Sequence, residues 1–230
     1  MNWLTHEEWQ ALALSLQIAA ISVACNLPLA VALAFTLARR RFPGRGMLDA
    51  VVHLPLVLPP VAVGYLLLVL FGARGPIGGW LQSWFGLHLV FTRAGAVLAT
   101  AVMSLPLMIR AMRVSLEHID PGLEEAARTL GAGPFDRFRS ITLPLMLPGI
   151  LAGAVTAFAA GLGEFGAVIT FVSNIPGQTR TLPLALYTAL QMPGGDQAAA
   201  RLALLSILLG VSGLGLAEFL SRRAARLLGR

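Results

Sequence analysis

Long apolar runs separated by short polar segments dominate the chain. A helix that crosses a bilayer needs about 20 mostly apolar residues, and five stretches of roughly that length are present. The expected spans are about 12–38, 51–71, 94–112, 145–168 and 202–220. A shorter apolar piece, residues 181–190, is expected to be interfacial or re-entrant. The pattern predicts an all-α membrane protein in which residues 1–230 form a single domain of five transmembrane helices.

The composition supports a membrane protein. Hydrophobic residues make up 57% of the chain and charged residues only 12%, whereas soluble domains carry about 25% charged residues. This number of charged residues is too small to cover a surface that faces water. We therefore expect most of the surface to face lipid.

The arginines predict how the spans are oriented. All 17 basic residues are arginines, and with five spans thirteen of them fall on one side, in segments 39–48, 110–141 and 222–230. The other side holds Arg74, Arg93, Arg180 and Arg201. Arginine-rich loops stay in the cytoplasm. We therefore expect a periplasmic N-terminus and a cytoplasmic C-terminus, and this asymmetry accounts for the net charge of +6 without a nucleic-acid partner.

Several kinds of chemistry are excluded by residues that the sequence does not contain. There is no lysine, so the chain has no P-loop, whose lysine contacts the nucleotide phosphates. The single cysteine, Cys25, excludes a disulfide framework and a thiolate metal site. No Ser/His/Asp set or metal-ligand spacing occurs. We therefore expect a non-catalytic chain that holds no cofactor of its own.

The segment 120–144 has the pattern of a helical loop with its own capping residues. Asp120 is a typical N-cap, Pro121 suits the first helical position, and Gly131 supplies a stop. A second short helix is expected over 134–141. Leu123, Ala127 and Leu130 form one apolar stripe. Such a stripe suits either a lipid surface or a groove on a protein, and its few bulky residues favour the groove.

The spacing within this loop resembles the cytoplasmic signature of ABC-importer permeases. The matching residues are Glu125, Ala126, Ala127, Gly131, Ile141, Leu143 and Pro144. The resemblance implies a type I importer permease in which this loop forms coupling helices seated in a cleft of an ATPase subunit. Nucleotide-driven closure of two such ATPases would then move the spans. ATP and Mg²⁺ would bind to these partner subunits.

Other segments resemble molybdate permeases in particular. The similar stretches are 53–65, 162–167, 173–181 and 191–195. Sulfate and tungstate permeases share the Gly-Glu-Phe-Gly element at 163–166, so that element marks the oxyanion group, whereas 173–181 favours molybdate. The resemblance implies a homodimer with the pathway at its two-fold axis, in the bacterial inner membrane, supplied by a periplasmic oxyanion-binding protein.

Five residues are candidates for the gate or pathway, each with a plainer alternative. Pro59 and Pro60 either shape a gate or kink a helix for packing. Ser104 and Ser173 either donate hydrogen bonds to a passing oxyanion or join helices. Arg180 steers an anion, meets the acidic rim of a binding protein, or is simply solvated.

Glu164 is a further candidate, because an acid near membrane depth is a functional hypothesis by default. A bare carboxylate in the path of a dianion would repel it, by about 4 kcal/mol per pair of unit charges at 4 Å in an effective dielectric near 20. We therefore expect Glu164 to pair with an arginine, to cap a helix, or to lie off the pathway.

Two other classes of function would leave signs that the sequence lacks. A secondary transporter is expected to show paired repeat halves with interrupted helices in matching positions, and no such symmetry is evident in the sequence. A membrane-embedded enzyme needs a catalytic set near one face, which is lacking.

Overall fold

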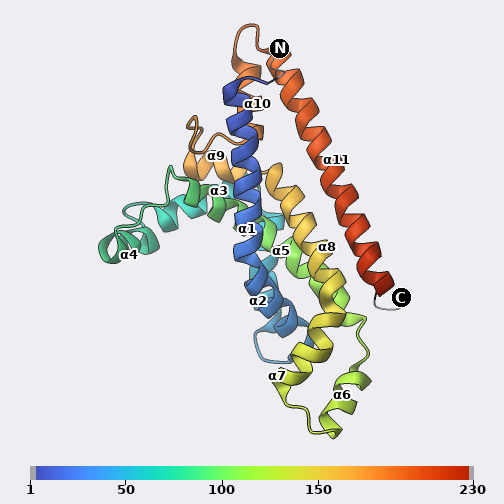
Figure 1. Ribbon diagram of the computed structural model, residues 1–230. Helices are drawn as coiled ribbons and strands as arrows, with labels where there is room; N and C mark the ends of the chain where they lie inside the picture. The colour runs from blue at the N-terminus through green and yellow to red at the C-terminus, as the bar shows by residue number, and fades with distance from the viewer. Residues whose placement is uncertain (1–3, 228–230) are drawn as a thin grey trace.

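The computed structural model describes residues 4–227, and the regular elements within that range are all helices (Figure 1). In chain order they are α1 (His6–Arg39), α2 (Arg45–Val57), α3 (Pro60–Phe71), α4 (Pro76–Phe85), α5 (Arg93–Glu117), α6 (Pro121–Thr129), α7 (Pro134–Arg137), a π-helical turn (Phe138–Thr142), α8 (Leu143–Leu162), α9 (Gly166–Val172), α10 (Leu182–Gln191) and α11 (Asp196–Leu227). The predicted all-α membrane fold is confirmed.

Three continuous helices in the described part are long and apolar enough to cross a membrane. They are α1, α5 and the run Pro134–Leu162, and the broken pair α2 and α3 makes a fourth if it counts as one crossing. The predicted fifth span, 202–220, falls within α11, and several of its side chains lie outside the described residues. The described residues therefore support three or four crossings, and the fifth stays a prediction.

The prediction of one continuous second span over 51–71 is wrong. Helix α2 ends at Val57, α3 begins at Pro60, and the two are bent by 116°. The cause is the pair Pro59-Pro60, because a residue before proline is pushed out of the α region and proline has no N–H to continue the helix. Pro59 accordingly has ψ of 135°.

The predicted fourth span, 145–168, is also displaced. The helix begins at Pro134, so the separate short helix expected over 134–141 is its first part, and it ends at Leu162. Pro144 does not break it, because the π-helical turn just before, where Leu143 N–H donates to the Phe138 carbonyl, relieves the crowding of the proline ring. Residues 163–165 then interrupt the chain before α9.

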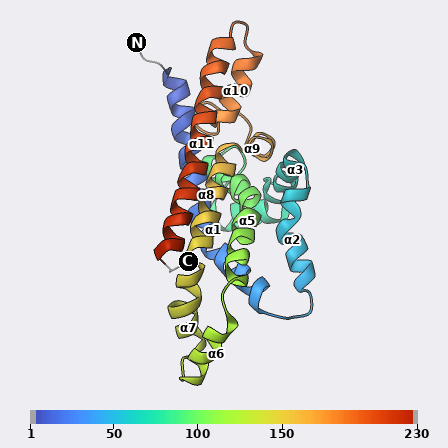
Figure 2. The same ribbon diagram turned by 90° about the vertical axis from the view of Figure 1, so that its right-hand side faces the viewer.

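Helices α1, α5 and α8 pack side by side along the length of the molecule, and α11 covers α8 (Figures 1 and 2). The segment predicted as 181–190 forms α10, which lies against α1 and α11 near the start of α1. At the opposite end α6 and α7 project from the bundle. Helix α4, which was not predicted, extends to one side.

Among residues 4–227 the core has three apolar clusters, of which the smallest joins α10 to α11 and the other two fill the centre of the bundle. One surrounds Phe171 and includes residues of α1, α3, α5, α9 and α10. The other surrounds Met108 and Met112 where α1, α5 and α8 meet. Between them, the buried Asn26 side chain of α1 donates to the Ala101 carbonyl of α5 at 2.8 Å. Polar side chains therefore join α1 to α5 at mid-length.

The two interrupted helices contact each other at their breaks. A Cβ atom at Gly166 would lie 2.7 Å from Pro60 Cβ, and one at Gly64 would lie 2.7 Å from the Ala167 carbonyl oxygen. Such spacing leaves no room for any side chain, so glycine is required for α3 and α9 to approach this closely. The Pro59-Pro60 break and the 163–165 break therefore form one packed unit.

We predict that Gly64→Ala destabilises this unit by about 1–3 kcal/mol, because the added methyl group overlaps backbone atoms of α9. The matched control is Gly46→Ala in α2, where a Cβ atom meets nothing within 4 Å; it is expected to raise stability by up to about 1 kcal/mol through helix propensity. Thermal unfolding of the detergent-solubilised protein measures both. Equal effects of the two substitutions would contradict the close packing.

Candidate functional site

The loop between α5 and the long helix beginning at Pro134 has the capping geometry that its sequence predicts. Asp120 Oδ1 accepts from the Gly122 N–H at 2.8 Å, and Pro121 is the first residue of α6. At the other end, Gly131 has φ of +85°, a conformation that favours glycine. These two devices make α6 a short helix with defined ends.

Helix α6 has no buried residue and carries apolar side chains into solvent. Leu130 is 88% exposed, Leu123 is 47% exposed, and Phe135 nearby is 71% exposed. The apolar stripe predicted from the sequence is therefore uncovered in the single chain. An exposed apolar stripe on a capped helix that projects from a bundle is typical of a surface that docks into a protein groove.

The seven signature residues divide by burial. Glu125, Ala126, Gly131 and Pro144 are exposed, whereas Ala127, Ile141 and Leu143 are partly buried. Four of the seven residues are therefore accessible to solvent in the single chain, and their role in coupling stays a prediction.

Glu124 ties α6 to the bundle. Its Oε1 accepts from the Thr142 hydroxyl at 3.0 Å and lies 3.5 Å from Arg39 Nη2 at the end of α1. Arg39 also donates to the Ile119 carbonyl at 3.3 Å. Sequence reasoning singled out Glu125 and missed Glu124, whose partners are distant in the chain. Its place in the first turn of α6 was the only local signal.

A second polar cluster joins α2 to α5 near the same end. Arg113 Nη1 lies 2.7 Å from Asp49 Oδ1 and Nη2 lies 3.9 Å from Glu117 Oε1. His53 Nδ1 is 2.9 Å from the Asp49 carbonyl oxygen, as expected for a hydrogen-bonded interface residue. These groups, with Arg110, line a cavity of about 300 Å³. The cluster links α2 to α5. Helix α2 is in turn followed by α3, which packs on α9.

Glu164 caps a helix. Its Oε1 accepts from the Ala167 N–H at 2.9 Å, at the start of α9. Of the alternatives left open by the sequence, the structure shows the cap, and no arginine of residues 4–227 forms an ion pair with this carboxylate. Glu164 belongs to the break at 163–165. Through Gly166 this break packs against Pro60, at the break between α2 and α3.

Within the described residues, no hydrogen bond or ion pair joins Ser104, Ser173 or Arg180 to Glu164. Ser104 is buried and accepts from Asn26 Nδ2 at 3.3 Å, so it joins α1 to α5. Ser173 follows α9 with φ of +63°, and its carbonyl accepts from the Thr179 hydroxyl. Arg180 is held by Asn174 Oδ1 at 3.0 Å and lies 3.6 Å from Glu7. Their roles in transport stay predictions.

We predict that Glu164→Gln unfolds at the wild-type temperature and transports normally, because the amide oxygen still caps α9. Glu164→Ala removes the acceptor and costs about 1 kcal/mol of stability. Thermal unfolding and uptake into proteoliposomes measure these effects. A folded Glu164→Gln variant without transport would show that the charge, and not the cap, is required.

Comparison with known proteins places these features in context. A family model described as "binding-protein-dependent transport system inner membrane component" matches residues 26–226. The chain is 57% identical to the molybdenum transport system permease protein ModB of Escherichia coli, over 99% of both chains. It is 53% identical to the protein of the same name from Haemophilus influenzae, over 97% of both. It is 38% identical to the sulfate transport system permease protein CysW of Synechocystis, over 86% of this chain and 72% of that one.

Two solved structures share the fold. One is a bacterial alginate ABC transporter in complex with an alginate pentasaccharide-bound periplasmic protein, with a TM-score of 0.72, 20% identity, and coverage of 98% of this chain and 81% of that chain. The other is the MetNI methionine ABC transporter in inward-facing conformations, with a TM-score of 0.69, 18% identity and 94% coverage of both.

Proposed function

The chain belongs to the family of binding-protein-dependent transport system inner membrane components, and we propose that it is the permease subunit of an ATP-driven molybdate importer. The observation that carries this proposal is the projecting α6 loop, whose apolar residues are exposed although its ends are capped and anchored. The identity to two molybdenum permeases over nearly the whole chain supports the cargo.

The proposed role is mechanical and not catalytic. Two ATP-binding cassette subunits bind ATP and Mg²⁺ and grip one α6 loop each. When they close, the displacement of α6 passes through Glu124 to Arg39 of α1 and to Thr142 at the entry of α8. Because α1 and α8 are long helices that pack on α5, a shift at this end tilts the bundle. The chain thereby converts closure of its partners into movement of the pathway.

A second copy of the chain is proposed to complete the pathway, giving a homodimer. Large apolar side chains along α2 and α3 are uncovered in the single chain: Val57 is 80% exposed, Val61 is 54% exposed and Tyr65 is 59% exposed. In a two-fold dimer the same face of both copies meets. The bent pair α2 and α3, with its Pro59-Pro60 break, is then available to line the passage.

The arginine-rich end is proposed to be cytoplasmic. Arg39 and Arg113 lie at the end where α6 projects, and arginine-rich segments stay inside. At the opposite end, Arg180 and Arg201 contact Glu7 and Glu8 of α1. In the proposed orientation the N-terminus is periplasmic, on the side where an oxyanion-binding protein delivers its cargo, and the C-terminus is cytoplasmic.

We predict that Leu130→Asp and Glu125→Arg each reduce retention of the ATPase subunits at least tenfold. A charged or reversed side chain in the centre of a docked interface costs about 2 kcal/mol or more, whereas both side chains are exposed in the isolated chain, so folding is preserved. Co-purification from detergent and ATP-dependent uptake are the measurements.

The matched control is Arg41→Glu, an exposed position at the same end but outside the loop, which is expected to keep the ATPase. If both loop variants retain the ATPase and transport normally, α6 is not the coupling element.

We predict that the chain, expressed with its ATPase and binding protein in a strain lacking molybdate uptake, restores accumulation of labelled molybdate. Excess tungstate, a similar tetrahedral dianion, is expected to compete, whereas sulfate at equal concentration is not. Restoration of sulfate uptake without molybdate uptake would assign the cargo to the sulfate branch, to which the chain is also related.

A further inference from the structure

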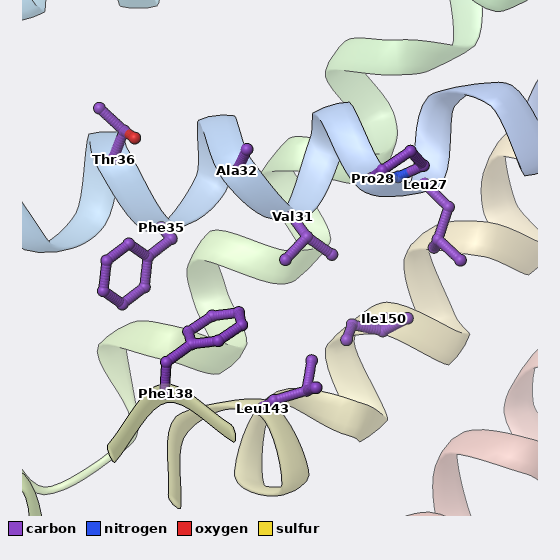
Figure 3. Close-up of a pocket in the computed structure, with 9 residues that line it drawn as sticks. All are labelled: Leu27, Pro28, Val31, Ala32, Phe35, Thr36, Phe138, Leu143 and Ile150. Carbon is purple, nitrogen blue, oxygen red and sulfur yellow. The ribbon is translucent and has the colours of Figure 1, made fainter. Parts of the chain in front are cut away.

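An apolar groove of about 660 Å³ lies between the second half of α1 and the start of α8 (Figure 3). Leu27, Val31 and Phe35 of α1 face Phe138, Leu143 and Ile150 across it. Thr36 is the only polar residue in its lining. The volume falls in the range of about 300–1,000 Å³ that is common for small-molecule sites.

The length of the groove matches one leaflet of a bilayer. It follows α1 from Leu27 to Thr36, which at 1.5 Å per residue is about 14 Å. Half of the hydrocarbon thickness of a bilayer is about 15 Å. A hydrocarbon chain that lies along α1 therefore fits the groove from the middle of the membrane to its surface.

A charged cavity of about 460 Å³ continues from the end of the groove. Phe35 and Phe138 line both cavities and stack edge to face, with ring centroids 5.4 Å apart. Beyond this pair the lining contains Arg39, Arg40 and Arg137 and a single acid, Glu124. The passage thus changes from apolar to basic over one turn of α1.

The basic charge in this cavity is only partly neutralised. Glu124 lies 3.5 Å from Arg39, whereas Arg40 and Arg137 have no ion pair among residues 4–227. The Arg137 Nε is buried and has no hydrogen-bond partner in the described part of the chain. Two guanidinium groups are therefore left to bind an anion at the level where α1 leaves the membrane.

We propose that an anionic phospholipid binds here, with one acyl chain in the groove between α1 and α8 and its phosphate between Arg40 and Arg137. Basic pockets between transmembrane helices at the cytoplasmic surface select anionic headgroups. The succession of an apolar groove one leaflet deep and a basic cavity at its end matches the succession of tail and phosphate in a lipid. The alternative occupant is a helix of a second chain, which is about 10 Å wide. Such a helix would need acidic residues at the level of Arg40 and Arg137 to match the basic cavity.

The site adjoins the coupling loop. Phe138 and Thr142 belong to the π-helical turn, and Thr142 and Glu124 line the charged cavity. A lipid held there fills the space between α1 and α8 where displacement of α6 enters the bundle. The inference needs the membrane location of the chain and is independent of its cargo, so it survives if molybdate is not transported.

Native mass spectrometry of the full chain, with the subunits it retains, tests the proposal. Phosphatidylglycerol and phosphatidylcholine with identical acyl chains are titrated into the detergent-solubilised protein. We expect phosphatidylglycerol to bind about tenfold more tightly or better, given two unpaired arginines. The double substitution Arg40→Gln with Arg137→Gln is expected to abolish this preference, whereas the matched control Arg41→Gln, which does not line the cavity, keeps it.

Val31→Trp tests the groove. The larger side chain occupies the groove and is expected to weaken the binding of both lipids by a similar factor. Unfolding temperatures identify any variant that fails to fold. If Val31→Trp does not fold, the substitutions at the exposed Arg40 and the half-buried Arg137 decide the question. Equal binding of the two lipids, an unchanged preference in the double variant, or displacement of phosphatidylglycerol by inorganic phosphate alone would each overturn the proposal. So would a Val31→Trp chain that loses its dimer and keeps its lipids, because the groove would then hold a second copy.

Discussion

Within a bilayer every backbone N–H and carbonyl must find a partner inside the protein, and the architecture depends on how this chain meets that requirement. Most of the chain meets it by continuous helices. At residues 58–59 and 163–165 the helices are interrupted, and the two interruptions are packed on each other through Gly64 and Gly166. Glu164 then supplies an acceptor for the Ala167 N–H. Irregular backbone at membrane depth is tolerated where protein or a water-filled passage surrounds it. Gly166 and Ala167 beside the breaks are buried, whereas Pro59, Pro60 and Gly163 are exposed in the single chain.

The same requirement distinguishes two parts of the molecule, one of continuous helices and one of interrupted helices. Helices α1, α5 and α8 are continuous where they meet around Met108 and Met112, and they are joined by Asn26 and by close glycine contacts such as Gly153 on Met108. The unit of α3 and α9 lies beside them and is connected through the bent α2 and the 163–165 break. In the proposed mechanism, a displacement that enters at Glu124 acts on these long helices.

Much of this was predictable, and the failures have physical causes. The caps at Asp120 and Gly131 were predicted because capping depends on residues within one turn of each other. The 116° bend between α2 and α3 was not predicted, because the mean hydropathy of two half-helices equals that of one continuous helix with the same residues. A helix starting at Pro134 was predicted, but its continuation into the fourth span was missed, because only the π-helical turn at Phe138–Thr142 shows how the helix passes Pro144. Glu124 was overlooked because Arg39 is far away in the chain.

Taken alone, the order of residues determined the membrane class, the arginine asymmetry and the capped loop with its apolar stripe, since each arises from composition or from contacts within a few residues. Tertiary structure decided which breaks meet, whether Glu164 caps or pairs, and where α1 and α8 leave a groove that ends in arginines. These outcomes depend on distances between segments about a hundred residues apart in the chain. Local propensity carries no information about such distances, because they are set by how glycines and bulky side chains fit when the helices pack.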